Sequence, residues 1–156
     1  MAQPGLRNAL LLFVLIVLHF SLRPLFMEWP VAPDLLTAAV LLGSLSLRAG
    51  NAALLGFTLG LLDEAIGLAG GWTPLLYTLA GFGGARFRDV IFADVRFFVP
   101  LYLFLATWLI HVGIAVLTGS LDVTTGLVIA PADALLTAMV GGLAERQLRR
   151  LSSTST

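Results

Sequence analysis

The sequence predicts an all-α protein: a polytopic membrane helix bundle of about six transmembrane helices, forming one integral membrane domain over residues 1–156. Three observations support this prediction. The chain is 58% hydrophobic and 12% charged, with a mean hydropathy of +0.97, which lies far outside the range of soluble domains. Six apolar stretches are separated by short polar turns. The nine basic residues, all of them arginine, segregate to one side of that arrangement.

The arginines predict the orientation of the chain. Basic residues in short loops are retained on the cytoplasmic side of a membrane. With the amino terminus inside, every arginine except Arg23 faces the cytoplasm. We therefore expect a multi-pass protein of the cell inner (cytoplasmic) membrane with both termini cytoplasmic. The arginines expected on that side are Arg7, Arg48, Arg86, Arg88, Arg96, Arg146, Arg149 and Arg150.

The first span is predicted over residues 6–22, and Pro24 is expected to end it because proline cannot continue the hydrogen-bond ladder of a helix. The span is short for a bilayer, which needs about 20 residues of helix. Arg7 and Arg23 are therefore expected to extend their charged groups outward at its two ends. No small-x-small cleavage site follows, so we expect the segment to be retained rather than removed as a secretory signal. Trp29 marks the outer interface.

The second span is predicted over residues 34–48, where Pro33 favours a helix start and Asp34 supplies an acidic cap. A turn is expected around Gly50, because glycine adopts the left-handed conformation that ends many helices. The third span follows at once, over residues 51–68.

The fourth span is the least regular. Its apolar part, residues 74–85, covers about half a bilayer and contains three glycines, so it either stops short or continues to residue 92. The segment that follows is amphipathic and is predicted to lie as a helix at the cytoplasmic interface. The residues expected at this interface are Arg86, Phe87, Arg88 and Ile91.

The fifth and sixth spans are predicted over residues 97–117 and 124–148. Gly119 is expected to close the fifth span, and Pro131 either kinks or starts the sixth. The tail, residues 152–156, is rich in serine and threonine and is predicted to be disordered.

Small residues and one carboxylate share a face of the third span. Gly56, Gly60, Asp63 and Gly67 lie at i, i+4, i+7 and i+11. Because small residues let helix backbones approach closely, this stripe is expected either to pack the bundle or to seat a partner helix. Asp63 has two interpretations. It is either hydrated at the outer rim or a constrained functional position, since burial of an aspartate in lipid costs about 2.5 to 3.5 kcal/mol.

The sixth span carries a similar face, with Asp133, Thr137 and Gly141 at four-residue spacing. Intramembrane carboxylates are usually functional. A structural alternative is that Asp133 caps the start of a helix at Pro131 by accepting backbone N–H bonds.

The two histidines, His19 and His111, fall in the outer halves of the first and fifth spans. Together with Asp63 and Asp133 they are candidates for the lining of an outward-open cavity, although linear spacing does not show that the four meet. The favoured interpretation of each histidine is a hydrogen-bonding interface residue rather than part of a proton relay or metal site. No pair of histidines at helical ligand spacing is present.

Several functional classes are excluded by absent residues or motifs. Zero net charge argues against a nucleic-acid-binding face, and the lack of cysteine excludes disulfides and thiol chemistry. The chain has no phosphate-binding loop and no nucleophile elbow. We therefore expect no catalytic residues, no metal and no cofactor.

Three short pieces occur in order along the middle of the chain: Pro33-Asp34-Leu35-Leu36, Gly56-Phe57-x-x-Gly60-Leu61-x-Asp63, and Leu76-Tyr77-Thr78-Leu79-Ala80-Gly81. In this order and spacing they resemble the MreD family of bacterial rod-shape-determining membrane proteins. Chain length, span count and the basic carboxyl-terminal end agree with the same family. The last span differs, because it has Thr137 and then Gly141-Gly142 where family members often carry an asparagine followed by a proline.

The resemblance implies a non-enzymatic scaffold of the cell-wall elongation machinery, the elongasome, which maintains rod shape. Its implied direct partner is MreC, and the assembly would couple MreB filaments to peptidoglycan synthesis by RodA and its penicillin-binding partner. Apart from these proteins and membrane lipid, no nucleic acid partner is expected, and homodimer formation stays open. The residues expected in partner binding or helix packing are Gly56, Phe57, Gly60, Asp63, Gly67, Pro33 and Asp34.

Two other functions are compatible with the sequence. The fold implied by the resemblance is also that of the substrate-binding subunits of vitamin transporters, so the main alternative is a substrate-binding membrane subunit of a small-solute transporter. Its pocket would lie near Asp63, His19 and His111. A membrane enzyme would instead use Asp63 and Asp133 as acid and base.

Overall fold

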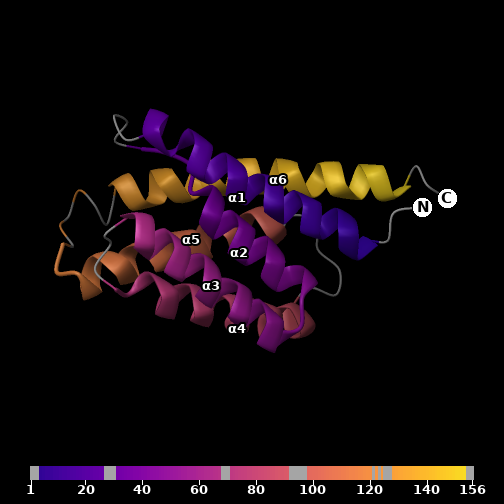
Figure 1. The fold of residues 1–156 in the computed structure, drawn as a ribbon, viewed down its shortest axis with the longest axis horizontal. Coiled ribbons are helices and arrows are strands. Elements are labelled where there is room, and N and C mark those ends of the chain that lie inside the picture. Colours follow the sequence, from indigo (N-terminus) through magenta and orange to yellow (C-terminus); the bar gives the residue numbers. More distant parts are fainter. Residues whose placement is uncertain are drawn as a thin grey trace.

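The structure is a computed structural model that describes residues 4–26, 31–67, 71–91, 98–120, 122, 124 and 128–153. Over these residues it contains six α-helices and no strand, which confirms the all-α class. Consecutive helices run in opposite directions, so α1 begins and α6 ends at the same end of the bundle (Figure 1). The helices are α1 (Pro4–Phe26), α2 (Leu35–Ser46), α3 (Ala49–Gly67), α4 (Thr73–Ile91), α5 (Phe98–Leu117) and α6 (Ala130–Ser153).

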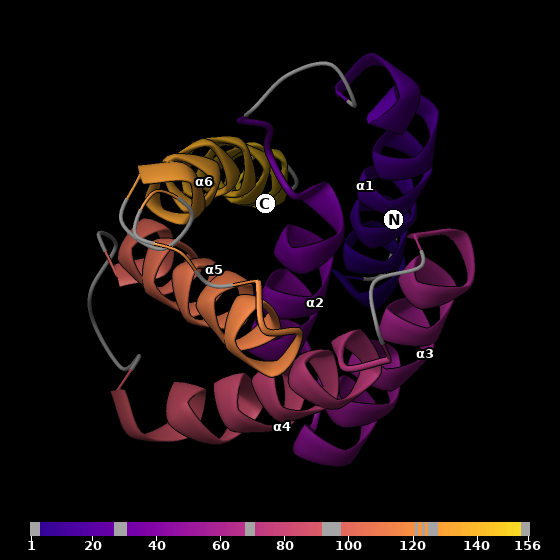
Figure 2. The ribbon, with the colours of Figure 1, turned by 90° about the vertical axis from the view of Figure 1, so that its left-hand side faces the viewer.

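The shortest helix, α2, forms the centre of the bundle, and the other five surround it (Figure 2). Every residue from Leu35 to Ser44 is buried. A helix that is apolar on all sides has no face suited to water, so it is expected at the centre of a fold. The position of α2 brings its amino-terminal end close to α1, α4, α5 and α6.

The most extensive helix contact joins α3 to α4, and glycines make it close. Gly56 lies against the backbone carbonyl of Tyr77, and Gly60 lies against the backbone of Pro74. Gly81 of α4 lies in turn against the backbone of Ala52. Of the two roles predicted for the glycine stripe, packing within the bundle is therefore the one observed at Gly56 and Gly60.

The other members of the third-span motif have different surroundings. Gly67 is the last residue of α3. Phe57 is 45% exposed, so about half of its surface lies outside the bundle.

Two predicted helix ends are wrong. Pro24 lies inside α1, which continues to Phe26. A proline this close to the carboxyl end removes only one hydrogen bond from the helix, so the last turn persists. Gly50 is the second residue of α3 and does not adopt a left-handed conformation. The turn before α3 is made instead at Leu47, whose backbone is extended.

Of the two ends considered for the fourth span, the later one is close to the end of α4 at Ile91. Residues 86–91 continue α4, because no glycine or proline interrupts the helix there. Arg86 lies 5.5 Å from the centre of the Phe82 ring, and Phe87 is exposed. Arg88 donates to the backbone carbonyls of Leu45 and Leu47, both at 3.1 Å. It thereby satisfies carbonyls at the carboxyl end of α2 that have no partner within the helix.

The last two helices agree in part with the prediction. Gly119 has a φ of +70°, which confirms that it closes the turn after α5. Pro131 is the second residue of α6, and Val128 and Ile129 directly before this helix are π-helical, so the backbone changes from π-helical to α-helical beside this proline. Ser152 and Ser153 are helical, which contradicts the disordered tail at these two positions. Residues 154–156 lie outside the described residues, as do Trp29 and Arg96.

Within the described part of the chain, two helices are long and apolar enough to cross a membrane, over Asn8–Leu25 and Phe98–Leu117. The apolar helix α2 has only 12 residues. The remaining helices, α3, α4 and α6, contain glycines and charged side chains that lower their hydropathy. Length and composition therefore support membrane association through α1 and α5, and they do not extend that support to all six predicted spans.

Candidate functional site

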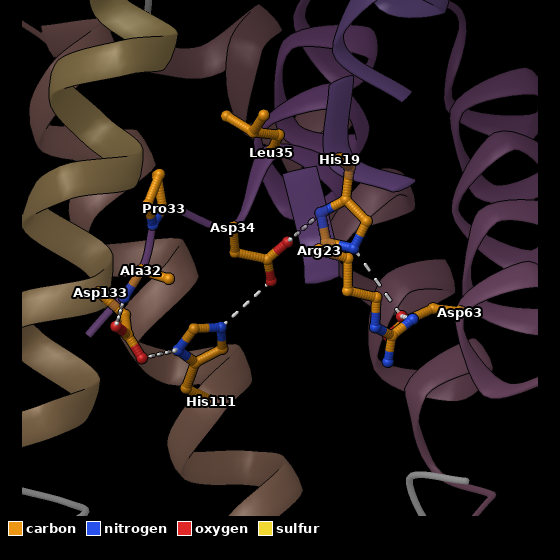
Figure 3. A pocket seen from close by; sticks show the side chains of 9 residues that line it. All are labelled: His19, Arg23, Ala32, Pro33, Asp34, Leu35, Asp63, His111 and Asp133. Carbon is orange, nitrogen blue, oxygen red and sulfur yellow. Dashed lines mark hydrogen bonds and ion pairs between the residues drawn. The ribbon is translucent and has the colours of Figure 1, made fainter. Parts of the chain in front are cut away.

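A pocket of about 300 Å³ lies where α1 ends and α2 begins, at the end of the bundle opposite the termini (Figures 1 and 3). Five helices and the segment before α2 contribute to its lining. The four polar residues named as candidates for a common cavity all line it, although they come from helices far apart in sequence. The lining residues are His19, Arg23, Ala32, Pro33, Asp34, Leu35, Asp63, His111 and Asp133.

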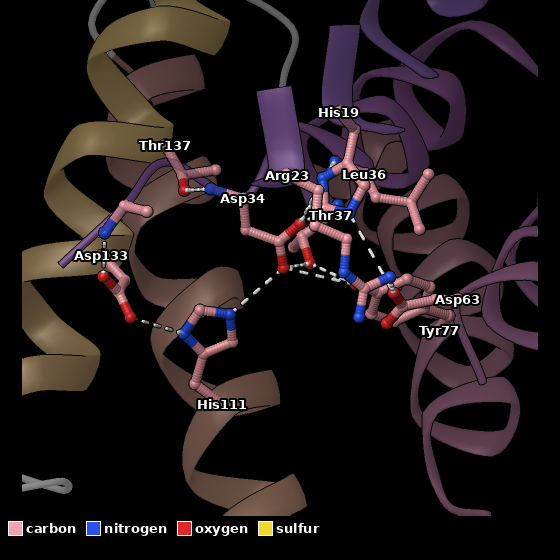
Figure 4. Close-up of polar contacts among 11 residues, drawn as sticks. His19, Arg23, Asp34, Leu36, Thr37, Asp63, Tyr77, His111, Asp133 and Thr137 are labelled. Atoms are coloured by element: carbon pink, nitrogen blue, oxygen red, sulfur yellow. Dashed lines mark hydrogen bonds and ion pairs between the residues drawn. The ribbon is translucent and has the colours of Figure 1, made fainter. Parts of the chain in front are cut away.

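Asp34 lies at the centre of the site, and its predicted capping role is confirmed (Figure 4). Its Oδ1 accepts hydrogen bonds from the backbone N–H groups of Leu36 and Thr37 at 3.1 and 3.0 Å. Its Oδ2 accepts from the hydroxyls of Thr37 and Tyr77, and lies 3.2 Å from Nε2 of His111. Donors arranged in this way favour the ionised carboxylate.

On one side of Asp34, His19 and Arg23 of α1 face Asp63 of α3 (Figure 3). Nδ1 of His19 accepts a hydrogen bond of 3.3 Å from the backbone N–H of Leu36. Its Nε2 lies 4.0 Å from Oδ1 of Asp63.

Arg23 donates to Oδ1 of Asp63 at 3.2 Å, and its side chain is only 27% exposed. The guanidinium of Arg23 thus faces a carboxylate of the pocket lining. Asp63, whose side chain is 19% exposed, is held in this ion pair. Arg23, the one arginine that is not predicted to face the cytoplasm, thus has a partner in the pocket.

On the other side of Asp34, His111 of α5 faces Asp133 of α6. Nδ1 of His111 lies 3.8 Å from Oδ2 of Asp133, and Oδ1 of Asp133 accepts a hydrogen bond of 2.8 Å from Ala32 N–H. One helical turn further on, Oγ1 of Thr137 accepts from the backbone N–H of Asp34 at 2.8 Å. Asp133 therefore binds the segment before α2 rather than capping its own helix. The polar face predicted for the sixth span attaches α6 to the start of α2.

Carboxylates and imidazoles alternate across the pocket, in the order Asp133, His111, Asp34, His19 and Asp63 (Figure 4). Only the contact between His111 and Asp34 is short enough for a hydrogen bond; the others measure 3.7 to 4.0 Å. The carboxylates and imidazoles are therefore neighbours without a continuous chain of direct hydrogen bonds between them. Over the described residues, no group of three or more His, Asp or Glu side chains is placed to hold a metal ion.

Two members of this network were not predicted as site residues. The hydroxyls of Thr37 and Tyr77 lie 2.8 Å apart, and both contact Asp34. A signal for Tyr77 exists in the sequence, because a tyrosine in an apolar, glycine-rich helix needs a partner for its hydroxyl. Thr37 stands three residues after a capping aspartate, where a hydroxyl is close to the cap.

The remaining candidate residues lie away from the pocket. The side chain of Phe57 points to the outer surface, and the glycines Gly56 and Gly60 are covered by α4. Arg86, Phe87, Arg88 and Ile91 belong to the last turns of α4, which lie at the end of the bundle where the termini are (Figure 1).

Comparisons of the chain with protein-family models, with curated proteins and with solved structures find no match.

Proposed function

We propose that all six helices lie in the cytoplasmic membrane, with both termini inside the cell. The apolar stretch of α1 supports this proposal, because only 6% of it is buried within the fold. A soluble monomer rarely exposes so much contiguous apolar surface to water. The arginines of α4 and α6 lie near the carboxyl ends of these helices, at the same end of the bundle as the termini (Figure 1). That end is the cytoplasmic one if positive residues are retained inside.

Reporter fusions test this orientation. A reporter that is active only in the cytoplasm is expected to be active after Ser153 and inactive after Ser120, because α6 separates these positions. The measurement is reporter activity normalised to the amount of fusion protein. Activity at the first position and none at the second supports the proposed orientation; the reverse pattern, or equal activity at both, contradicts it.

We further propose that the protein acts as an MreD-like scaffold of the cell-wall elongation machinery. One observation carries this proposal: the three sequence pieces of the family resemblance come together in space. Tyr77 of the third piece donates to Asp34 of the first and presents its carbonyl to Gly56 of the second. Asp63 of the second piece lines the same pocket as Asp34. The pieces thus describe one structural unit, the contact of the α3–α4 pair with the start of α2.

This arrangement bears on where a partner helix would bind. Because α4 occupies the glycine stripe of α3, MreC would contact the outer surface of the bundle instead. Phe57 lies between Gly56 and Gly60 in the sequence yet points outward, which makes it our candidate contact residue. Such a scaffold would connect MreB filaments to RodA and its penicillin-binding partner through surfaces rather than through a reacting centre.

Copurification with MreC tests the scaffold proposal. We expect tagged protein to retain MreC from the same organism in detergent, and Phe57→Ala to reduce the retained amount severalfold, because aromatic anchors dominate many interfaces. Leu109→Ala is the matched control, since Leu109 is also exposed but lies on α5. If the unsubstituted protein retains no MreC, the scaffold proposal fails. An equal loss with both variants would contradict the role of Phe57.

The pocket favours a second candidate function, a substrate-binding membrane subunit of a small-solute transporter. Ligand pockets are typically concave sites with a few convergent polar groups, and the cavity at Asp34 has this character. A solute that binds there and raises the unfolding temperature of the purified protein would support this function.

A further inference from the structure

The lining of the pocket carries more negative than positive charge. Asp34, Asp63 and Asp133 are three carboxylates, whereas Arg23 is the one guanidinium among the lining residues. Counted without the histidines, these four side chains give the lining a formal charge of −2.

The excess charge resides mainly on the two outer carboxylates. Asp34 is surrounded by donors from the protein itself, as described above. Asp63 and Asp133 lie on opposite sides of Asp34 and accept fewer hydrogen bonds than it does (Figure 3). Over the described residues, hydrogen bonds from Arg23 and Ala32 reach Oδ1 of these two carboxylates, and none reaches their Oδ2 atoms. Oδ2 of Asp133 faces Nδ1 of His111 at 3.8 Å, which is longer than a hydrogen bond. Each carboxylate therefore has an oxygen available to a further donor.

The size and composition of the cavity limit what that donor is. A volume of about 300 Å³ lies at the lower end of the range for small-molecule pockets and greatly exceeds the space of one water molecule. The described side chains do not form a metal-binding group. An anion would face three carboxylates, which is electrostatically unfavourable.

We propose that this pocket binds a small organic cation of the amine class, held by Asp63 and Asp133. An ammonium group carries only donors and so complements carboxylate oxygens that lack them. A cleft with an excess of negative charge also concentrates cations. This inference goes beyond the scaffold function and does not rest on it, since a scaffold and a transporter subunit can both carry such a site.

The probes are butylamine and 1,4-diaminobutane, added to the purified full chain in detergent. The controls are 1,4-butanediol, which has a similar size without charge, and succinate, which has the opposite charge. Thermal unfolding and isothermal titration measure binding. Both amines are expected to bind saturably and to raise the unfolding temperature by about 3 °C or more at saturation, whereas the diol and succinate leave it unchanged.

Variants locate the binding. Asp133→Asn keeps an oxygen that can accept from Ala32 N–H, and Asp63→Asn keeps one for Arg23, so both preserve much of the local structure. Each is expected to weaken amine binding about tenfold or more, because a charge-assisted contact is lost. Glu64→Gln is the matched control. Glu64 neighbours Asp63, accepts from Gly71 N–H and does not line the pocket, so amine affinity is expected to change by less than about twofold.

Three outcomes would overturn the inference: no saturable binding of either amine, equal binding of the diol, or an equal loss of affinity with Glu64→Gln and Asp133→Asn. If Asp63→Asn does not fold, Asp133→Asn alone decides whether the site is correctly placed. Because MreC is absent from these measurements, a negative result would leave the scaffold proposal standing, and failure to bind MreC would not affect the amine site.

Discussion

Replacing Gly56 with alanine is expected to destabilise the protein by about 3 kcal/mol or more. A Cβ atom at this position would overlap the backbone carbonyl of Tyr77. Overpacking in a close-packed interior typically costs about 1 to 3 kcal/mol. Here the obstacle is backbone rather than a flexible side chain, so α3 and α4 would have to separate to accommodate one methyl group. The measurement is the free energy of unfolding in detergent, with far-UV circular dichroism to follow helix content.

Gly50→Ala is the matched control, because Gly50 lies in the same helix and a Cβ there would meet no atom within 4 Å. Alanine favours a helix over glycine by about 0.5 to 1 kcal/mol, so this variant is expected to be as stable as the original chain or slightly more stable. If Gly56→Ala and Gly50→Ala unfold alike, α3 and α4 are not in close backbone contact.

Removing the Asp34 side chain is expected to have the second large effect, a loss of about 2 to 4 kcal/mol for Asp34→Ala. Loss of an N-cap alone costs about 0.5 to 2 kcal/mol. The same substitution takes the acceptor from the hydroxyls of Thr37 and Tyr77 and from His111, and buried donors left without a partner add to the cost. Unfolding in detergent again provides the measurement.

Two milder variants separate the contributions at this site. Asp34→Asn keeps a side-chain oxygen for the N–H groups of Leu36 and Thr37 but removes the charge, and is expected to cost less than alanine. Tyr77→Phe removes one hydroxyl and leaves the cap intact, with an expected loss of about 1 kcal/mol. Equal stability of Asp34→Ala and Tyr77→Phe would show that Asp34 contributes little beyond its bond to Tyr77.

Local features were the ones most readily predicted. Asp34 was recognised as a cap because capping needs only residues within one helical turn, Leu36 and Thr37. The stripe that contains Gly56 and Gly60 was recognised because helical periodicity places these residues on one face. Helix ends were predicted less well. Proline and glycine often end helices, yet Pro24 lies inside α1 and Gly50 lies inside α3.

The all-α class, the apolar character of the helices, the cap at the start of α2 and the polar residues in otherwise apolar segments could all be predicted from the amino-acid sequence. Each of these depends on composition or on spacing within one helix. The packing of the helices is what brings Asp34, Asp63 and Asp133 into one pocket with two histidines, pairs Arg23 with Asp63, and covers the glycine stripe with α4. These contacts join different elements of the chain, and some join residues 40 or more positions apart, such as Arg23 and Asp63 or Ala32 and Asp133. Periodicity within a helix specifies which face a side chain occupies, but the neighbour of that face is set by how all six helices pack together.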